Sequence, residues 1–192
     1  LGVDALYIAS QIVVAIQALI TRRTNPLESI LIGIGRLDAG TAYNVVAEEA
    51  AMEGTIRVFS PELRKATKER IELVASSIAA MYGGTVSIEW KDFTSPLIND
   101  EESTLEVRKV LTSVFGKDSV VESRTPSLGG DDFAEYILKV PGCYAFVGSR
   151  NPEVPETGVA HHNSHFDVDD GALSVMVNLM SSYAIEFLNG EV

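Results

Sequence analysis

The spacing of apolar residues switches between helical and strand-like periods along residues 1–93, and this order limits the folds open to the chain. Apolar residues recur at helical spacing over residues 4–22, where Asp4 is the expected N-cap. Residues 29–34 form a β-branched apolar run, and residues 50–59 alternate apolar with other side chains. The sequence therefore predicts one helix followed by two strands, with a polar, glycine-rich loop between the strands.

A second helix and a third strand complete this first region. Ser60-Pro61 is a typical helix start, and a buried stripe follows at helical spacing as far as Gly83-Gly84. Residues 85–93 then alternate as in a half-buried strand. The order helix, strand, strand, helix, strand matches a ferredoxin-like split βαβ domain that lacks its first strand. Because such a sheet exposes unpaired backbone groups, and because Leu1 is not an initiator methionine, we expect a truncated or proteolysed product.

A second unit follows Ser95-Pro96, where the pattern of the sequence changes. We therefore predict an α/β (α+β) protein with two parts, residues 1–94 and residues 95–192. The elements expected in the second part are helices at residues 101–115 and 169–188, a helix that opens at Asp131 after the turn 127–130, and short strands at residues 120–121 and 143–148.

Charge and composition exclude several classes of protein. The 192 residues are 46% hydrophobic and 22% charged, as in soluble globular proteins, and the net charge of -12 leaves no basic field for nucleic acid or an anionic membrane. The longest apolar stretches stop short of the roughly 20 residues that cross a bilayer. The single cysteine, Cys143, cannot form an internal disulfide and lies in an apolar run, so we expect an inert thiol in a cytoplasmic protein.

All three histidines lie within five positions, at His161, His162 and His165, directly before the acidic segment 166–170. Imidazole beside carboxylates is a donor set that Zn²⁺ or Mn²⁺ accepts. A polar loop whose histidines face water fits the spacing equally well. Because this segment leads from a loop into a helix, its rings need not share one centre, and we expect one ligand rather than three. A hydrolytic site needs about three protein donors per ion, so the others would have to come from elsewhere.

The turn from Gly129 to Phe133 is a second candidate. It places Asp131 and Asp132 at the start of a helix, where capping of exposed amides and the helix dipole explains them. In the functional alternative, Gly129 and Gly130 let the backbone approach a substrate or metal closely.

Asn44 and Arg57 are the candidates in the first region. Asn44 ends a loop and Arg57 lies on the following strand, and by default both are ordinary surface residues. An amide and a guanidinium on one small sheet could also hold a carboxylate together, with Arg57 forming a two-pronged, charge-assisted pair.

Several of these motifs, in this order, resemble the M20 metallopeptidases, most closely the branch of N-acyl-amino-acid, hippurate and indoleacetyl-amino-acid hydrolases. The resemblance covers nearly the whole chain. It rests on Asp4 with the helix after it, residues 22–26, Gly40-Thr-Ala-Tyr-Asn44, Gly54-Thr-Ile-Arg57, Gly129-Gly-Asp-Asp-Phe133, Pro141-Gly142 and His162-Asn-Ser-His-Phe-Asp167.

The resemblance implies a metal-dependent amidohydrolase that removes the acyl group from N-acyl amino acids. Residues 1–94 would be its lid or dimerisation domain, and residues 95–192 the C-terminal segment of a zinc-peptidase-like catalytic domain. The family's metal-binding histidine falls on His162. Two divalent ions per intact subunit are implied, zinc or manganese with cobalt as an alternative, and so is a homodimer that forms through the lid domain.

The resemblance also implies roles for the other candidates. Asn44, Arg57, Gly129 and Gly130 would bind the substrate, with the first two facing an active site that in a dimer can be the partner's. A glutamate general base and an oxyanion-stabilising lid histidine belong to family sequence that precedes Leu1. We therefore expect this chain to be inactive alone.

The sequence departs from the family pattern in places and leaves two alternatives open. Val45-Val46-Ala47 follows Asn44 where relatives read x-Ile-Pro, and Ser164 replaces a proline. The alternatives are a dipeptidase or carboxypeptidase of the same family, and a non-catalytic ferredoxin-like module that binds a small ligand or mediates dimerisation.

Overall fold

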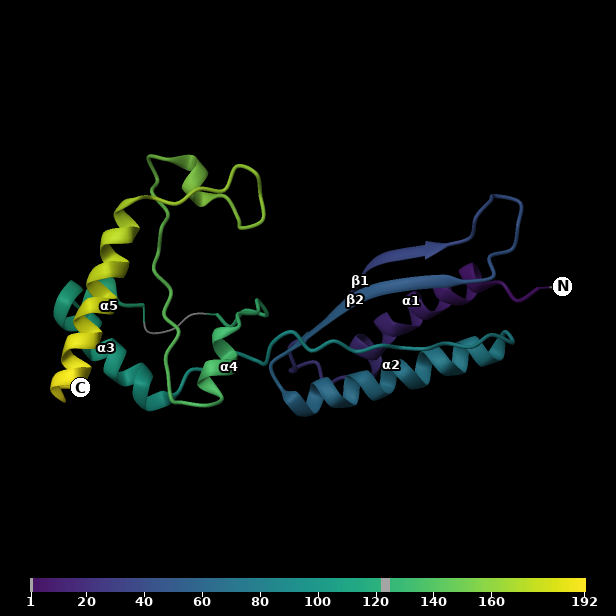
Figure 1. Cartoon of the computed structure of the whole chain (residues 1–192), viewed down its shortest axis with the longest axis horizontal. Helices are drawn as coiled ribbons and strands as arrows, with labels where there is room; N and C mark the ends of the chain where they lie inside the picture. The colour runs from purple at the N-terminus through teal and green to yellow at the C-terminus, as the bar shows by residue number, and fades with distance from the viewer. Residues whose placement is uncertain (1, 122–124) are drawn as a thin grey trace. The chain divides into compact units, whose positions relative to one another are not determined.

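The structure of the chain, a computed structural model, describes residues 2–121 and 125–192 and has a mixed α/β architecture with a small two-stranded sheet (Figure 1). The chain divides into two compact units. Unit 1 comprises Leu1–Leu97 with Ser127–Asp132, and unit 2 comprises Ile98–Pro126 with Phe133–Val192. The short stretch Ser127–Asp132, which carries the Gly129 turn, thus belongs to unit 1.

Unit 1 packs two helices against one antiparallel strand pair. Its elements are α1 (Ala5–Arg23), β1 (Ile30–Ala39), β2 (Ala50–Val58) and α2 (Pro61–Met81). The sequence predicted all four, because each helix has a cap that can be recognised. Asp4 Oδ1 accepts a hydrogen bond from Tyr7 N at 3.0 Å, and Ser60 Oγ accepts one from Leu63 N at 3.1 Å.

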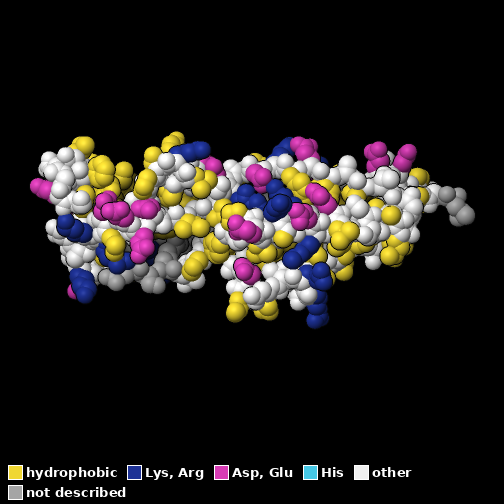
Figure 2. Space-filling view, turned by 90° about the horizontal axis from the view of Figure 1, so that it is seen from below, with side chains coloured by type: hydrophobic (Ala, Val, Ile, Leu, Met, Phe, Trp, Pro, Cys, Tyr) yellow, Lys and Arg dark blue, Asp and Glu magenta, His cyan; other side chains and the backbone are white. Residues whose placement is uncertain are grey.

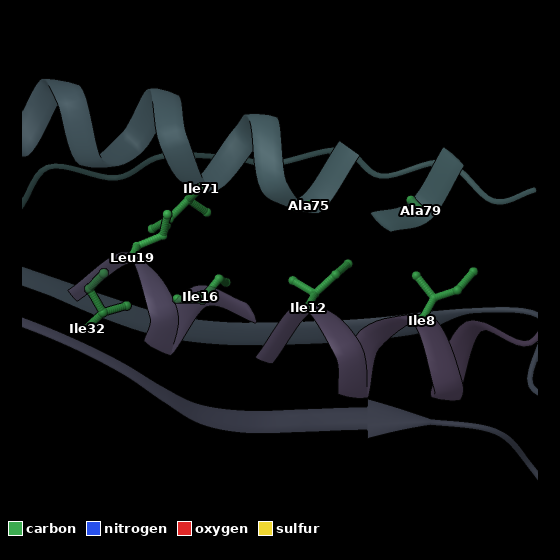
Figure 3. Packing of buried hydrophobic residues seen from close by; sticks show 8 residues of the cluster. All are labelled: Ile8, Ile12, Ile16, Leu19, Ile32, Ile71, Ala75 and Ala79. Carbon is green, nitrogen blue, oxygen red and sulfur yellow. The ribbon is translucent and has the colours of Figure 1, made fainter. Parts of the chain in front are cut away.

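The core of unit 1 lies between α1, α2 and the inner face of the sheet (Figure 3). One side of α1 contributes large aliphatic residues, and α2 faces them with smaller ones that let the two helices approach. Close packing of these side chains supplies most of the unit's stability. The buried cluster is Ile8, Ile12, Ile16 and Leu19 from α1, Ile32 from β1, and Ile71, Ala75 and Ala79 from α2.

The register of the strand pair runs from Ile30 opposite Val58 to Ala39 opposite Ala50. A bulge interrupts it between Ile34 and Arg36. Beside the bulge, Gly54 brings the two backbones together: a Cβ at this position would lie 2.5 Å from the carbonyl oxygen of Gly33. The Gly54-Thr-Ile-Arg57 motif therefore begins with a residue that the sheet itself requires.

The third predicted strand, residues 85–93, is absent as a strand. The alternation behind the prediction is present, since Val86, Ile88 and Trp90 pack against the core while the residues between them are exposed. Among the described residues, however, the sheet contains only β1 and β2, so this extended segment has no strand paired to it. The prediction failed because a period of two reports which side chains are buried, whereas a strand also needs a partner.

Unit 2 is built around the contact between α3 (Glu101–Phe115) and α5 (Gly171–Asn189). Val110 of α3 is 1% exposed, and Tyr183 Oη of α5 donates a hydrogen bond to Glu106 Oε2 at 2.9 Å. The predicted strands at residues 120–121 and 143–148 are absent, for the same reason as in unit 1. The remaining elements are η1 (Lys117–Ser119), α4 (Phe133–Ile137) and η2 (Pro155–Gly158).

Much of α5 lies exposed although the helix is strongly apolar. Leu173, Val177, Met180 and Leu188 are each more than half exposed, while Ala172 is buried. Among the described residues, α1 and α5 are both long and apolar enough to span a bilayer by length and composition alone. For α1 this reflects its role as the core helix of unit 1, whereas α5 presents an apolar face with little packed on it.

Candidate functional site

The three histidines lie on an exposed loop of unit 2 between η2 and α5. The ring of His161 packs edge-on against Phe166, with centroids 4.7 Å apart. Asn163 organises the turn: its side-chain oxygen accepts a hydrogen bond from His165 N at 2.9 Å, and its carbonyl accepts one from Phe166 N at 3.1 Å. All three histidines are exposed, and His161 alone among them has a described ring contact.

His162 has an unusual backbone conformation. With φ 63°, it is the one non-glycine residue in the left-handed region within residues 2–121 and 125–192. Histidine tolerates this region better than most side chains, but the conformation is uncommon and carries a cost. Strain of this kind is concentrated at binding and catalytic positions, so the backbone singles out the residue that the family motif assigns to the metal.

The described part of the chain does not build a metal centre by itself. Nowhere within it do three His, Cys, Asp or Glu side chains gather as they must to hold a metal ion. His162 offers one imidazole, on a loop with space around it. No chemical step of a metal centre can therefore be derived from these residues alone.

Hydrogen bonds hold the Gly129 turn to other residues of unit 1. Arg57 Nη1 donates a hydrogen bond to Leu128 O at 3.0 Å, and Thr94 Oγ1 donates one to Asp131 O at 2.9 Å. Gly130 lies close to Thr94, whose Cγ2 would be 3.0 Å from a Cβ at this position. Gly130 therefore has a local packing reason in addition to the substrate contact predicted for it.

Asn44 and Arg57 are not brought together. Asn44 lies in the loop that joins β1 to β2, which contacts the start of α1 through a hydrogen bond from Ala5 N to Ala47 O. Arg57 lies near the opposite end of β2, seven residues beyond Ala50, which is about 23 Å at strand rise. Both side chains are exposed, so they offer two separate contacts rather than one shared carboxylate site.

Cys143 and Tyr183 are two partly buried titratable groups of unit 2 whose pKa values are raised. Burial raises the pKa of the Cys143 thiol, as expected for an unreactive cysteine. Burial and the hydrogen-bonded carboxylate of Glu106 raise the pKa of Tyr183 to about 12, which keeps the phenol protonated. Neither group has the properties of a nucleophile or general base at neutral pH.

Sequence reasoning missed three polar residues beside the histidine loop: Asn151, Thr157 and Asp169. Asn151 Nδ2 donates a hydrogen bond to Asp169 Oδ2 at 2.6 Å, and Thr157 is a buried polar residue at 6% exposure. The dipeptide Asn151-Pro152 is a turn signal that could have drawn attention to the first of them.

Comparison with known proteins covers nearly the whole chain. The sequence model of the peptidase family M20/M25/M40 matches residues 6–186. A thermostable carboxypeptidase 2 of Saccharolobus solfataricus is 34% identical over 97% of this chain and 47% of its own length. An N-acetyl-L-cysteine deacetylase of Bacillus subtilis is 33% identical over 90% of this chain and 39% of its own length.

A similar structure has also been solved. It is a dinuclear metal-binding peptidase of the M20 family from Bacillus subtilis, with a TM-score of 0.73 and 28% identity, and the match covers 97% of this chain and 46% of that one. The chain thus spans less than half the length of each of these proteins.

Proposed function

The chain belongs to the peptidase family M20/M25/M40, and from this membership we propose that the intact protein is a metal-dependent hydrolase that cleaves the amide bond of N-acyl amino acids. The resemblance found in the sequence motifs is confirmed by the family match and by the deacetylase and M20 peptidase among its relatives. The observation that carries the proposal is the backbone of His162. This residue matches the ligand histidine of the family motif, and it is the one non-glycine residue in the described part of the chain with a left-handed backbone conformation.

In this proposal, His162 supplies one donor to a pair of divalent ions, zinc or manganese with cobalt as an alternative. The other donors and the general base lie in protein outside these 192 residues. Two observations support this: the described residues hold no group of three donors, and the relatives are about twice as long as the chain. The chain alone is then inactive.

Unit 1 is proposed as the ferredoxin-like lid or dimerisation domain and unit 2 as the C-terminal segment of the catalytic domain. The extended segment at residues 85–93 supports this proposal, because its alternate side chains are partly buried as in a strand. In a ferredoxin-like sheet, one further strand would lie between this segment and β2. Within the described residues β1 pairs only with β2, so its outer edge offers backbone groups to a second subunit. We accordingly propose a homodimer formed through unit 1.

The exposed face of α5 is proposed to pack on the remainder of the catalytic domain rather than on lipid. Asn178, Ser181, Ser182 and Glu186 interrupt its apolar surface, a pattern suited to a protein interior better than to a bilayer. On the face seen in Figure 2, lysine and arginine side chains lie next to acidic ones, which supports neither nucleic acid nor an anionic membrane as a partner. A cytoplasmic location is proposed from the single, half-buried cysteine.

Asn44, Arg57, Gly129 and Gly130 are proposed to bind the substrate. Arg57 supports this because its guanidinium carries five N–H donors and Leu128 O takes only one of them in the contact described. Since Asn44 precedes β2 and Arg57 lies near its far end, one small N-acyl amino acid would not reach both, so one residue would contact the substrate of its own subunit and the other the substrate of the partner's site.

A carboxypeptidase is the second candidate function, because the carboxypeptidase of Saccharolobus solfataricus is as similar to this chain as the deacetylase is. The deacylase and the carboxypeptidase would use the same metal centre. They would differ in the group on the carbonyl side of the cleaved amide bond, which is a simple acyl group in one case and an amino acid or peptide in the other.

A panel of substrates tests the proposal and separates the candidates. The intact protein, loaded with Zn²⁺ or Mn²⁺, is incubated with N-acetyl and N-benzoyl amino acids and with unblocked dipeptides, and release of the free amino acid is followed. Faster turnover of the N-acyl substrates supports the deacylase. A preference for peptides supports the carboxypeptidase or dipeptidase. Absence of both activities and of bound metal would leave the non-catalytic module.

A further inference from the structure

The loop that carries His162 is closed at its base by a side-chain pair. Asn151 lies just before this loop and Asp169 just after it, and Asn151 Nδ2 donates a hydrogen bond to Asp169 Oδ2 at 2.6 Å. The backbone closes the same gap, since Asp169 N donates to Ser149 O at 3.0 Å. Both side chains are half-buried, so the bond between a carboxylate and an amide is partly shielded from water and correspondingly strong.

The same carboxylate also fixes the start of α5. Asp169 Oδ1 accepts a hydrogen bond from Gly171 N at 2.7 Å, so one oxygen of the carboxylate holds the loop and the other holds the first turn of the helix. A Cβ at Gly171 would lie 2.7 Å from Asp169 Oδ1, so a side chain at this position would displace the carboxylate. Asp169 therefore joins the loop to the long helix that anchors unit 2.

Thr157 holds the interior of the loop to the same point. Its hydroxyl accepts a hydrogen bond from Asn151 N at 2.8 Å and donates one to Val154 O at 2.7 Å. The residue is 6% exposed, so these bonds satisfy a buried polar group that would be costly to leave unpaired. Asn151 is thus fixed through its backbone by Thr157 and through its side chain by Asp169.

These contacts bear on His162 because a residue in the left-handed region needs surroundings that hold it there. Its own turn is exposed, and the Asn163 contacts described above are local to that turn. The bonds that tie the loop to the rest of unit 2 lie at its two ends, at Asn151 and Asp169. A ligand must be held to within roughly half an ångström to be effective, which a loop free at its base does not achieve.

We propose that Asn151 and Asp169 are a pair of positioning residues that hold the loop 152–168 so that His162 is presented in its ligand conformation. This inference rests on the proposed function for the role of His162, but the ordering of the loop by the pair does not. No contact between either residue and the metal is implied. The pair acts through the loop, and neither residue is catalytic.

An exchange of the two side chains tests the pair. Asp169→Asn leaves one carbonyl oxygen for two donors, Asn151 Nδ2 and Gly171 N, so one of the two hydrogen bonds is lost. Asn151→Asp places two carboxylates face to face and removes the bond between the pair. The double variant N151D/D169N restores an amide opposite a carboxylate and leaves the net charge unchanged. An acceptor remains for Gly171 N and for Glu153 N, which donates to Asn151 Oδ1. Glu153→Gln, an exposed charge change in the same loop, is the matched control.

The first measurement is amide hydrogen exchange in the 192-residue chain, which requires neither metal nor activity. We expect peptides covering residues 152–168 to exchange at least tenfold faster in both single variants, and to return to wild-type rates in the double variant. Peptides from α3 and the Glu153→Gln variant should not change. Equal exchange in all variants, or a double variant no better than the singles, would overturn the proposal.

The second measurement is the affinity of the intact protein for Co²⁺, followed by the visible absorption of the bound ion. Loss of a supporting partner typically weakens metal binding by about 10–100-fold, so the single variants should bind at least tenfold more weakly and the double variant should recover. Full affinity in the single variants would overturn the positioning role. If the wild-type protein binds no Co²⁺ while the exchange results hold, the proposed function fails and the ordering of the loop by this pair stands.

Discussion

Gly54 shows what a single residue of a motif does before any substrate is considered. A Cβ at this position would lie 2.5 Å from the Gly33 carbonyl oxygen and 2.7 Å from the side chain of Ile34, so only a hydrogen atom fits there. The family motif from Gly54 to Arg57 therefore combines a structural requirement at its first position with a functional candidate at its last.

We predict that Gly54→Ala destabilises unit 1 by about 2 kcal/mol, because the methyl group must push apart a paired backbone. Urea unfolding followed by circular dichroism measures this change. Gly33→Ala, on the neighbouring strand with no atom within 4 Å of the added Cβ, is the matched control and should cost less. Equal effects of the two substitutions would contradict the steric explanation.

Asp92 gives unit 1 a predictable dependence on pH. Its hydrogen bond with Lys68, at 2.8 Å, is the main cause that lowers the pKa of its carboxyl group. A carboxylate whose pKa is lower in the folded state stabilises that state above its unfolded pKa of about 3.9, and loses the effect as the pH falls through the folded value. The contribution is small because the Asp92 side chain is 59% exposed.

We therefore expect Asp92→Asn to flatten the fall in stability below about pH 4, and Lys68→Met to have the same effect. The measurement is the midpoint of thermal unfolding between pH 7 and pH 3. An unchanged slope in both variants would show that the pair contributes nothing to acid sensitivity.

Site residues were predictable only where a residue type or motif is rare. The histidine cluster was visible in the sequence because all three histidines of the chain fall together. Asn151 and Asp169 were not, because Asn and Asp are common in loops and only the fold reveals that residues 18 positions apart are bonded. The separation of Asn44 from Arg57 likewise follows from strand length and register, which a motif does not state.

At the level of elements, helices were predicted well and strands poorly. A helix satisfies its own backbone, so spacing and caps such as Asp4 and Ser60 suffice to locate it. A strand depends on a neighbour, and the extended segment at residues 85–93 has its alternating burial without one. The sequence thus predicted the burial pattern of this segment correctly but not its pairing, because no strand lies beside it among the described residues.

This yields a prediction for the backbone of that segment. In the 192-residue chain, amides of residues 85–91 should exchange with solvent much faster than those of β2, because no ladder protects them. In the intact protein they should become as protected as β2. Hydrogen exchange with mass spectrometry measures both states. Protection already equal to that of β2 in the isolated chain would contradict the proposal of an absent strand.

For the molecule as a whole, membership of the M20 family accounts for features that are otherwise unexplained. α5 exposes an apolar face, two predicted strands of unit 2 are unpaired, and a strained histidine stands on a loop without two further donors. Each agrees with the proposal that further parts of the catalytic domain lie outside these residues, since the chain spans less than half the length of its relatives. The sequence identifies the family because its motifs are spread along the chain, whereas the described residues bring no three metal-binding side chains together.

The central claim is that position 162 donates an imidazole to the metal centre of the intact hydrolase, and metal content together with deacylation tests it most directly. The intact protein should bind about two divalent ions per chain. His162→Ala should lose at least one of them and reduce hydrolysis of an N-acyl amino acid by more than a hundredfold, whereas His165→Ala should retain both. A His162→Ala protein that keeps its full metal content and its full rate would contradict the account.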